Sequence, residues 1–292
     1  MVDQAQPPRY LPHMQQPGVL HMGLSRIAPQ NWIETDDALG EYHRHKRELA
    51  RRDFSAVFAE SGDCVAAQGE LDERLEAHLL ADHGGEYWRD PAAIHSVRGG
   101  FSVADEVGPP LWRASLLVAD DLLLMLPRKG AYCLAAASLC SPSHWRLAEK
   151  IGRPMHEVHD PVPGIHDDLS GRIERFFEHL RPEAPVQRFN WSLQWNDSLF
   201  CPGRTSGESG ELFYRTERQT LTRLPDSGAI AFTIRVYRHP LRSLAAVPGA
   251  LEALRGAILA APEPLLEYKS FASFLPALED LIIDAAPEQR SA

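Results

Sequence analysis

One polar stretch, residues 212–224, carries the side-chain types that bind and react with small ligands. In an extended strand, side chains alternate between two faces. The two faces hold Arg215, Glu217, Gln219 and Leu221 on one side, and Thr216, Arg218, Thr220 and Thr222 on the other. A buried strand this polar needs partners for its side chains. A bound ligand supplies them, and so do cross-strand ion pairs on a solvent-facing strand, for example with Arg235.

A histidine close to two prolines is the second candidate for chemistry. His159 precedes Pro161 and Pro163, whose rings restrict the backbone and help to fix an imidazole at one angle. Neutral imidazole is a common metal ligand, although most lone loop histidines hydrogen-bond to the backbone instead. His156 and His166 lie nearby, and spacing on an irregular loop does not decide which of the three faces a ligand.

The bulk composition is that of a globular protein, with 292 residues, 44% of them hydrophobic and 24% charged. The formal net charge of −10 argues against a nucleic-acid partner and against docking on an anionic membrane. The most apolar stretch, residues 116–126, contains Asp120 and Asp121 and is too short to span a bilayer. The polar N-terminus lacks the apolar core of a signal peptide, so we expect a cytoplasmic protein.

Common nucleotide and metal motifs are absent from the sequence. It contains no G-x-G-x-x-G, Walker A, G-x-S-x-G or H-E-x-x-H motif. The four cysteines form no C-x-x-C pair, which argues against a zinc knuckle or a cysteine-ligated iron–sulfur cluster in this chain. We expect four reduced thiols.

The pattern of apolar residues predicts helices mixed with antiparallel strands. We expect helices over 32–53, 68–82 and 144–151, another beginning at Asp167 or Asp168, and helices over 241–260 and 265–284. We expect strands over 111–118, 122–127 and 131–140, followed by a three-stranded meander over 186–197, 212–224 and 229–238. The pattern by itself indicates an α+β fold with an antiparallel sheet.

No break in composition divides the chain into separate domains. Residues 1–30 read as an irregular lead-in, residues 31–285 as a single domain, and residues 286–292 as a frayed tail.

Three sequence motifs are specific enough to indicate a family. The first is LCSPSHWRLAEKIG at 139–152, which leads into HDPVPG at 159–164. The second is RFNW at 188–191, and the third is RTERQTLTRLP at 215–225, which closes with AFTIRVY at 231–237. Together they resemble the haem-dependent oxidative N-demethylase alpha-subunit family, over about residues 10 to 285.

The resemblance implies a haem-binding PAS-like domain with helical additions at both ends, carrying haem b. It implies oxidation of a small secondary amine such as dimethylamine to methylamine and formaldehyde, with dioxygen and electrons from NADPH. The electrons arrive through a partner reductase with FMN and a [2Fe–2S] cluster. A tetrahydrofolate-binding subunit captures the formaldehyde.

The resemblance also implies roles for single residues. His159 is the expected axial ligand of the haem iron, with His156 and His166 as rivals. The expected catalytic residues are Glu217, which holds the ammonium of the substrate, Arg218, which polarises dioxygen, and Thr220, which donates to the distal oxygen. The expected cofactor-binding residues are Arg188, Asn190, Trp191, Arg215 and Arg223.

Some of these roles have alternatives. Arg218 or Arg223 serves either to polarise dioxygen or to clamp a propionate, and Arg188 and Asn190 can instead line the substrate side. The aromatic face with Trp191 and Trp195 is either ordinary core or the apolar wall of the haem. At the level of function, the alternatives are a haem-PAS gas or redox sensor without turnover, a cofactor-free interaction module, and an enzyme for another amine.

Overall fold

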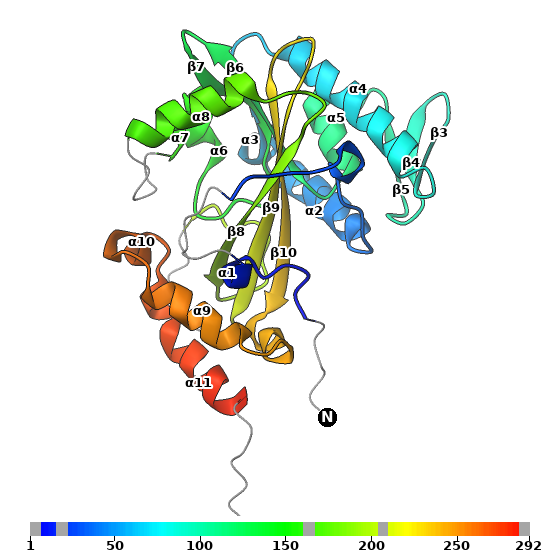
Figure 1. Ribbon diagram of the computed structural model, residues 1–292. Coiled ribbons are helices and arrows are strands. Elements are labelled where there is room, and N and C mark those ends of the chain that lie inside the picture. The colour runs from blue at the N-terminus through cyan, green and yellow to red at the C-terminus, as the bar shows by residue number, and fades with distance from the viewer. Residues whose placement is uncertain (1–6, 16–22, 160–166, 204–209, 286–292) are drawn as a thin grey trace, which may run out of the picture.

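The computed structural model describes residues 7–15, 23–159, 167–203 and 210–285 (Figure 1). Its main feature is a seven-stranded antiparallel sheet with the strand order β1-β8-β9-β10-β6-β7-β2. These strands are β1 (Ser25–Arg26), β2 (Phe58–Glu60), β6 (Asp121–Arg128), β7 (Ala131–Ser138), β8 (Val186–Gln194), β9 (Phe213–Arg223) and β10 (Ile230–Pro240). A smaller sheet has the order β3-β4-β5, with β3 (Tyr87–Arg89), β4 (Ala93–Ser96) and β5 (Phe101–Ala104).

Helices pack against both sheets. The α-helices are α1 (Pro12–Gln15), α2 (Leu39–Arg52), α3 (Phe54–Val57), α4 (Val65–Asp82), α5 (Pro110–Leu117), α6 (Leu147–Lys150), α7 (Met155–His159), α8 (Asp167–His179), α9 (Ala250–Leu259), α10 (Glu263–Tyr268) and α11 (Leu275–Ala285). Short 3-10 helices are η1 (Pro29–Asn31), η2 (Leu241–Ala246) and η3 (Phe271–Ser273). The mixture of helices and antiparallel sheet confirms the predicted α+β class.

The predicted meander is confirmed, and it forms the centre of the large sheet. Strands β8, β9 and β10 pair in sequence order through continuous registers, such as Asn190 opposite Glu217 and Thr220 opposite Thr233. The turn between β9 and β10 closes at Gly228, whose φ of 68° favours glycine. The hairpin β6–β7 joins the meander through β10–β6 pairing.

The predicted strand over 111–118 is wrong, because these residues form helix α5. Pro110 stands in its first turn, where a missing N–H costs nothing. Every residue from Leu111 to Leu117 is buried, so the helix shows no amphipathic alternation. A short apolar run of this kind does not distinguish a strand from a buried helix. The expected helix over 144–151 is likewise reduced to α6, and His144 has a left-handed φ of 63°.

The sequence pattern did not predict some of the short strands. The expected irregular lead-in contains β1, which pairs with β8 at the edge of the large sheet. The three short strands β3–β5 were not predicted. All four cysteines are free and buried. No helix in the described part of the chain is both long enough and apolar enough to cross a bilayer.

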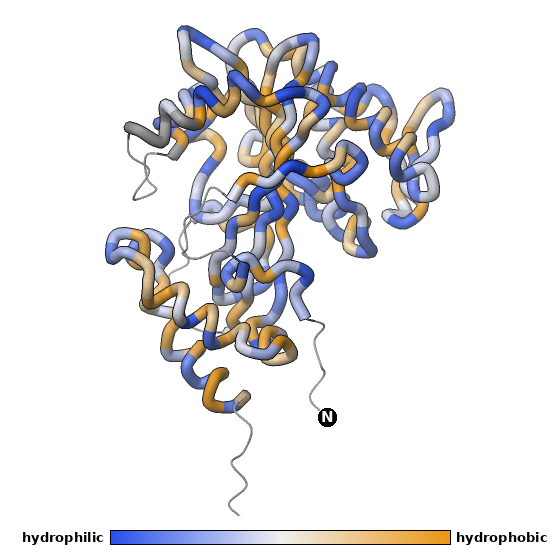
Figure 2. Tube along the Cα trace, viewed as in Figure 1, coloured by the Kyte–Doolittle hydropathy of each residue, from blue (hydrophilic) through white to orange (hydrophobic). Residues whose placement is uncertain are grey.

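The helices form layers on the two faces of the large sheet (Figure 1). Helix α2 covers one face, where the guanidinium carbon of Arg235 lies 4.0 Å from the centroid of the Tyr42 ring. Helices α7 and α8 lie on the other side of the sheet. Hydrophobic residues gather where strands and helices meet at the centre of the molecule (Figure 2).

The C-terminal helices build a second hydrophobic cluster at the far end of β8 and β9. There Trp191 stacks on Phe271 at 5.3 Å between ring centroids, and Leu254 and Leu278 are fully buried. These helices lie at the bottom of the view in Figure 1, below α7 and α8. The predicted helical tail therefore folds back onto the meander.

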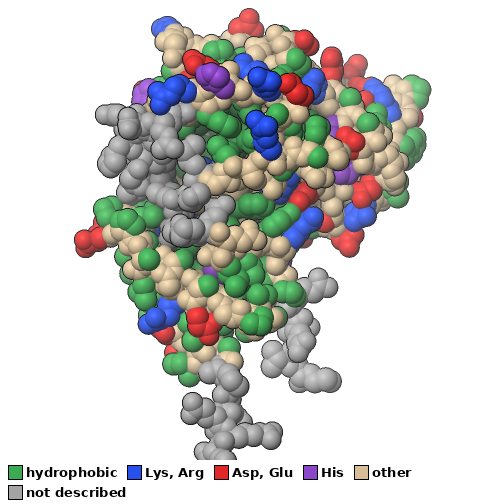
Figure 3. All heavy atoms as spheres, in the orientation of Figure 1, with side chains coloured by type: hydrophobic (Ala, Val, Ile, Leu, Met, Phe, Trp, Pro, Cys, Tyr) green, Lys and Arg blue, Asp and Glu red, His purple; other side chains and the backbone are tan. Residues whose placement is uncertain are grey.

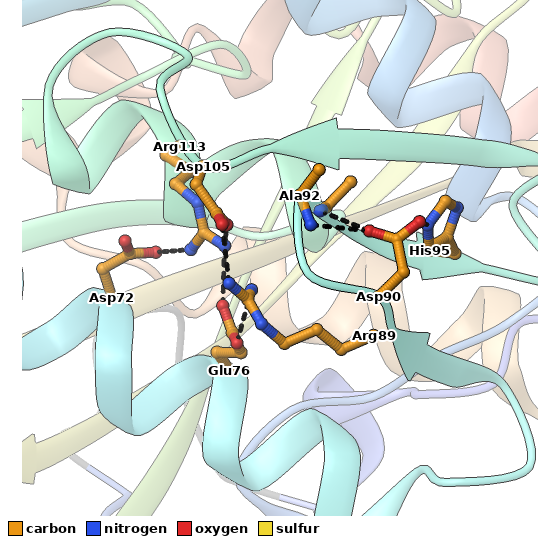
Figure 4. A network of polar contacts seen from close by, with 9 residues as sticks. Asp72, Glu76, Arg89, Asp90, Ala92, His95, Asp105 and Arg113 are labelled. Carbon is orange, nitrogen blue, oxygen red and sulfur yellow. Dashed lines mark hydrogen bonds and ion pairs between the residues drawn. The ribbon is translucent and has the colours of Figure 1, made fainter.

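An ion-pair network joins the small sheet to α4 and α5 (Figure 4). Arg113 of α5 contacts Asp72 at 2.7 Å, Glu76 at 2.6 Å and Asp105 at 3.0 Å. Arg89 of β3 contacts two of the same carboxylates, Glu76 at 2.8 Å and Asp105 at 2.7 Å. The Arg113 side chain is 7% exposed and that of Arg89 is 33% exposed, so the two cations differ chiefly in burial.

We expect Arg113→Met to lower the free energy of unfolding by about 1–3 kcal/mol, measured by urea denaturation. Its three carboxylates are partly exposed and regain water, which keeps the cost below that of a fully buried pair. The matched change Arg89→Met is expected to cost less than about 1 kcal/mol, because water already solvates that group. Equal costs at the two positions would contradict the role of burial.

Candidate functional site

A cavity of about 370 Å³ lies between the large sheet and the helices α6, α7 and α8. The segment 139–145, Leu24, and Tyr268 and Lys269 at and just after the end of α10 also line it. Figure 3 shows the surface beside α8 hollowed, with hydrophobic side chains inside the hollow. The volume lies within the range of about 300–1,000 Å³ that is usual for small-molecule sites.

Most of the lining is apolar. The sheet contributes Leu123 and Met125 from β6 and Phe232 and Ile234 from β10, and α8 contributes Phe176 and Phe177 among others. Ile173, Phe176 and Phe177 of α8 therefore face the cavity, as expected from their helical spacing. Such a wall suits a large apolar or aromatic ligand.

The opposite end of the cavity is polar because β8 and β9 turn their polar faces toward it. Arg188, Asn190 and Ser192 from β8 line the cavity, as do Glu217 and Gln219 from β9. Cross-strand pairing places Asn190 directly opposite Glu217. The Nδ2 atom of Asn190 donates to Glu217 Oε2 at 3.3 Å, and Gln219 Nε2 donates to the same oxygen at 2.9 Å.

Arg188 has an unsatisfied nitrogen. Its Nε is buried and has no hydrogen-bond partner among the described residues. Burial lowers the pKa of the Arg188 guanidinium, and the charge of Glu217 opposes that shift. Buried polar atoms nearly always have partners, so an orphan beside a cavity points to a ligand.

Lys269, just after α10, reaches the same polar end from the C-terminal helices. Its Nζ donates to Asn190 Oδ1 at 3.2 Å and to the carbonyl of Trp191 at 2.6 Å. Burial lowers the pKa of Lys269 to about 8, although Glu217 favours the charged form. The lysine is therefore largely protonated at neutral pH and adds a positive charge to the site.

The segment 139–145 is held against the sheet by Asp121. Its carboxylate accepts hydrogen bonds from the backbone N–H groups of Cys140 and Ser141, both at 2.8 Å. Through this anchor Ser141, Ser143 and His144 line the cavity. Sequence reasoning missed His144 as a site residue, although it lies within the motif at 139–152.

Two of the expected cofactor-binding arginines lie near the cavity but do not line it. Arg215 is fully buried and donates to the carbonyl of Ser141 at 2.5 Å, while its Nε lies 3.5 Å from Glu217 Oε1. Arg223 donates to the carbonyl of Leu180 at 2.9 Å and to Tyr132 Oη at 2.9 Å. Both arginines tie surrounding segments to β9.

Three other expected site residues lie on the opposite face of the sheet. Arg218 donates to the carbonyls of Trp32 at 3.1 Å and Asn31 at 2.5 Å, and Thr220 shares a hydrogen bond with Thr233 at 2.8 Å. Trp191 belongs to the second hydrophobic cluster. The alternation along β8 and β9 places all three away from the cavity.

Of the three histidines near Pro161 and Pro163, the structure describes the side chain of His156 alone. His156 has a side chain that is 54% exposed and lies 3.9 Å from Glu157. His159 ends helix α7, its side chain lies outside the described residues, and so does all of His166. Nearby Met155 and Val158 of α7 line the cavity. Among the described residues, no three His, Cys, Asp or Glu side chains gather to hold a metal ion.

The sequence of this chain matches a known protein family. The profile described as "Haem-dependent oxidative N-demethylase, alpha subunit-like" matches residues 23–278, which is most of the chain. The chain belongs to this family. The resemblance read from the three motifs is thereby confirmed, and the match spans both the large sheet and the cavity.

For a haem-dependent N-demethylase alpha-subunit-like protein, the cavity has a suitable chemical character. A porphyrin needs an extensive apolar wall, which β6, β10 and α8 supply, and a cation for its propionates, and Lys150 of α6 lines the cavity. The residues present therefore fit the cofactor that the family name prints. Lys269 could not be found from local sequence, because its place depends on how the C-terminal helices fold back.

Proposed function

We propose that this chain is the haem b-holding catalytic subunit of an oxidative N-demethylase, an oxidoreductase that acts on a small secondary amine with dioxygen. The observation that carries the proposal is the cavity itself, which combines an apolar wall with a charged end in a member of this family. When bound, haem would supply dioxygen binding and electron-transfer chemistry.

We propose a PAS-like core for the same protein. The order β7-β6-β10-β9-β8 within the large sheet sets a hairpin beside a meander. Helices α6, α7 and α8 lie between the hairpin and the meander in sequence, and they border the cavity. This sequence of hairpin, helices and meander supports the proposal.

His159 remains our proposed axial ligand. Met155 and Val158 line the cavity, so the helix α7 that ends at position 159 borders it. His144 also lines the cavity and is the rival that the structure adds.

The polar end of the cavity has the proposed substrate role. Glu217 is 9% exposed, and Asn190 and Gln219 hold its carboxylate in a fixed orientation. A carboxylate fixed in this way attracts an ammonium group and can accept its proton. Arg218 and Thr220 lie beyond the sheet, so we now assign them to holding β9 in place rather than to the reaction.

The term "alpha subunit" in the family description suggests partner subunits. We propose a reductase with FMN and a [2Fe–2S] cluster that takes electrons from NADPH, and a tetrahydrofolate-binding subunit that captures formaldehyde. We propose a cytoplasmic location and no nucleic-acid or membrane partner, in keeping with the net charge of −10.

An absorption spectrum of the purified protein tests this function. We expect a Soret band that shifts on adding dithionite and changes again with dimethylamine, and we expect formaldehyde to form when an electron donor is supplied. A preparation that stays colourless after hemin is added would reject the haem proposal. Binding of dimethylamine and of other N-methylated amines without turnover of any of them would favour a sensor.

A further inference from the structure

The charge of the cavity differs in sign from the charge of the chain. The whole chain carries −10, yet three cationic side chains and two carboxylates line the cavity among the described residues. Lys150 and Glu149 belong to α6, while Arg188, Lys269 and Glu217 share the polar end. The polar end therefore carries an excess of positive charge, which attracts an anionic group.

Arg188 supplies the strongest reason to expect a bound carboxylate there. Its buried Nε has no partner among the described residues, and burial lowers the pKa of its guanidinium. A planar guanidinium pairs with a carboxylate through two parallel hydrogen bonds. The Nζ of Lys269, held by Asn190 and the carbonyl of Trp191, stands at the same end and adds a second cation.

Glu217 supplies the reason to expect an ammonium group beside that carboxylate. Its Oε2 accepts two hydrogen bonds, from Asn190 and Gln219, whereas within the described part of the chain Oε1 has only a 3.5 Å contact with Arg215. An ionised carboxylate has about four acceptor positions, so Oε1 retains capacity for an N–H donor.

We propose that the polar end binds an amine that also carries a carboxylate, as an N-methylated amino acid does. The carboxylate binds Arg188 and Lys269, and the ammonium group binds Glu217. A simple dialkylammonium ion would bring another positive charge next to these two cations, which is unfavourable at a poorly solvated site. The oxidation of such a substrate rests on the proposed function, but its binding does not.

Haem propionates are a second source of the same carboxylate chemistry. Propionates require cations, but they carry no ammonium group to pair with a neighbouring carboxylate, and Glu217 would repel them. The side-by-side arrangement of Glu217 and Arg188 therefore favours a zwitterion over a propionate.

Calorimetric titration of the purified holoprotein tests the proposal. The ligands are N-methylglycine, N-methylglycinamide, which lacks the negative charge, and dimethylamine. We expect N-methylglycine to bind at least about tenfold more tightly than either of the others. In Arg188→Gln the ratio between acid and amide is expected to fall to within about threefold, whereas the exposed control Arg181→Gln keeps the wild-type ratio.

Equal affinity for acid and amide in the wild type would overturn the proposal. So would an Arg188→Gln protein that loses its Soret band but keeps the ratio, because Arg188 would then serve a propionate. If Arg188→Gln does not fold, the affinity ratio between acid and amide is measured in Lys269→Gln and in the wild type instead, and it still tests the proposal. A colourless wild type rejects the haem function alone, since the acid-to-amide ratio is still measurable by calorimetry.

Discussion

Replacing His159 with alanine is expected to remove the Soret band from the purified protein. Loss of a group that merely orients a metal ligand already weakens metal binding by about 10–100-fold, so loss of the ligand itself should reduce haem retention at least that much. The measurement is haem content per folded chain, with circular dichroism to show that the α+β fold persists. A variant with unchanged haem content would remove His159 from the site.

Two matched histidine variants test whether loss of the Soret band is specific to His159. His156→Ala changes a side chain that is 54% exposed, and we expect wild-type haem content. His144→Ala changes a residue that lines the cavity, and we expect the Soret band to persist. If His144→Ala loses the band and His159→Ala keeps it, the axial ligand belongs to the segment 139–145 instead.

Replacing Asp121 with alanine is expected to destabilise the protein by about 3–5 kcal/mol. Asp121 is fully buried, and its carboxylate accepts from the backbone N–H groups of Cys140 and Ser141. The alanine variant leaves both donors unsatisfied and removes a negative charge near the fully buried Lys46. Urea denaturation measures the loss, and the exposed control Asp280→Ala should change stability by less than about 0.5 kcal/mol. A loss below about 1 kcal/mol in Asp121→Ala would contradict this anchoring role.

The same carboxylate makes stability depend on pH. Burial raises the pKa of Asp121 to about 6, above its ordinary value of 3.8, even though Lys46 and the two N–H donors lower it. The folded chain therefore binds this proton more tightly than the unfolded chain, and the contribution of Asp121 falls as pH rises from about 4 through about 6. The stability difference between wild type and Asp121→Asn should shrink over that window. A constant difference would mean that Asp121 does not titrate there.

The sequence by itself determined the class of the fold and which side chains share a face in the meander. Alternation along a strand has a period of two, so Glu217 and Gln219 must lie together, as must Arg188 and Asn190. This alternation depends only on the extended backbone of the strand itself, so it can be predicted without knowing the partner strand. The family motifs likewise lie in continuous segments, which is why the family could be read from them.

Only the tertiary structure decided which face of each strand meets the cavity. Arg218 and Thr220 are as polar as Glu217, yet the pairing of β8, β9 and β10 and the position of α8 put them on the other side. The helix over residues 110–117 could not be found from the sequence pattern for a similar reason. Its residues are buried on all sides, and this removes the amphipathic periodicity that identifies a surface helix. Lys269 reaches Asn190 across 79 positions of sequence, and such a contact arises only from long-range packing of the C-terminal helices, which no local pattern records.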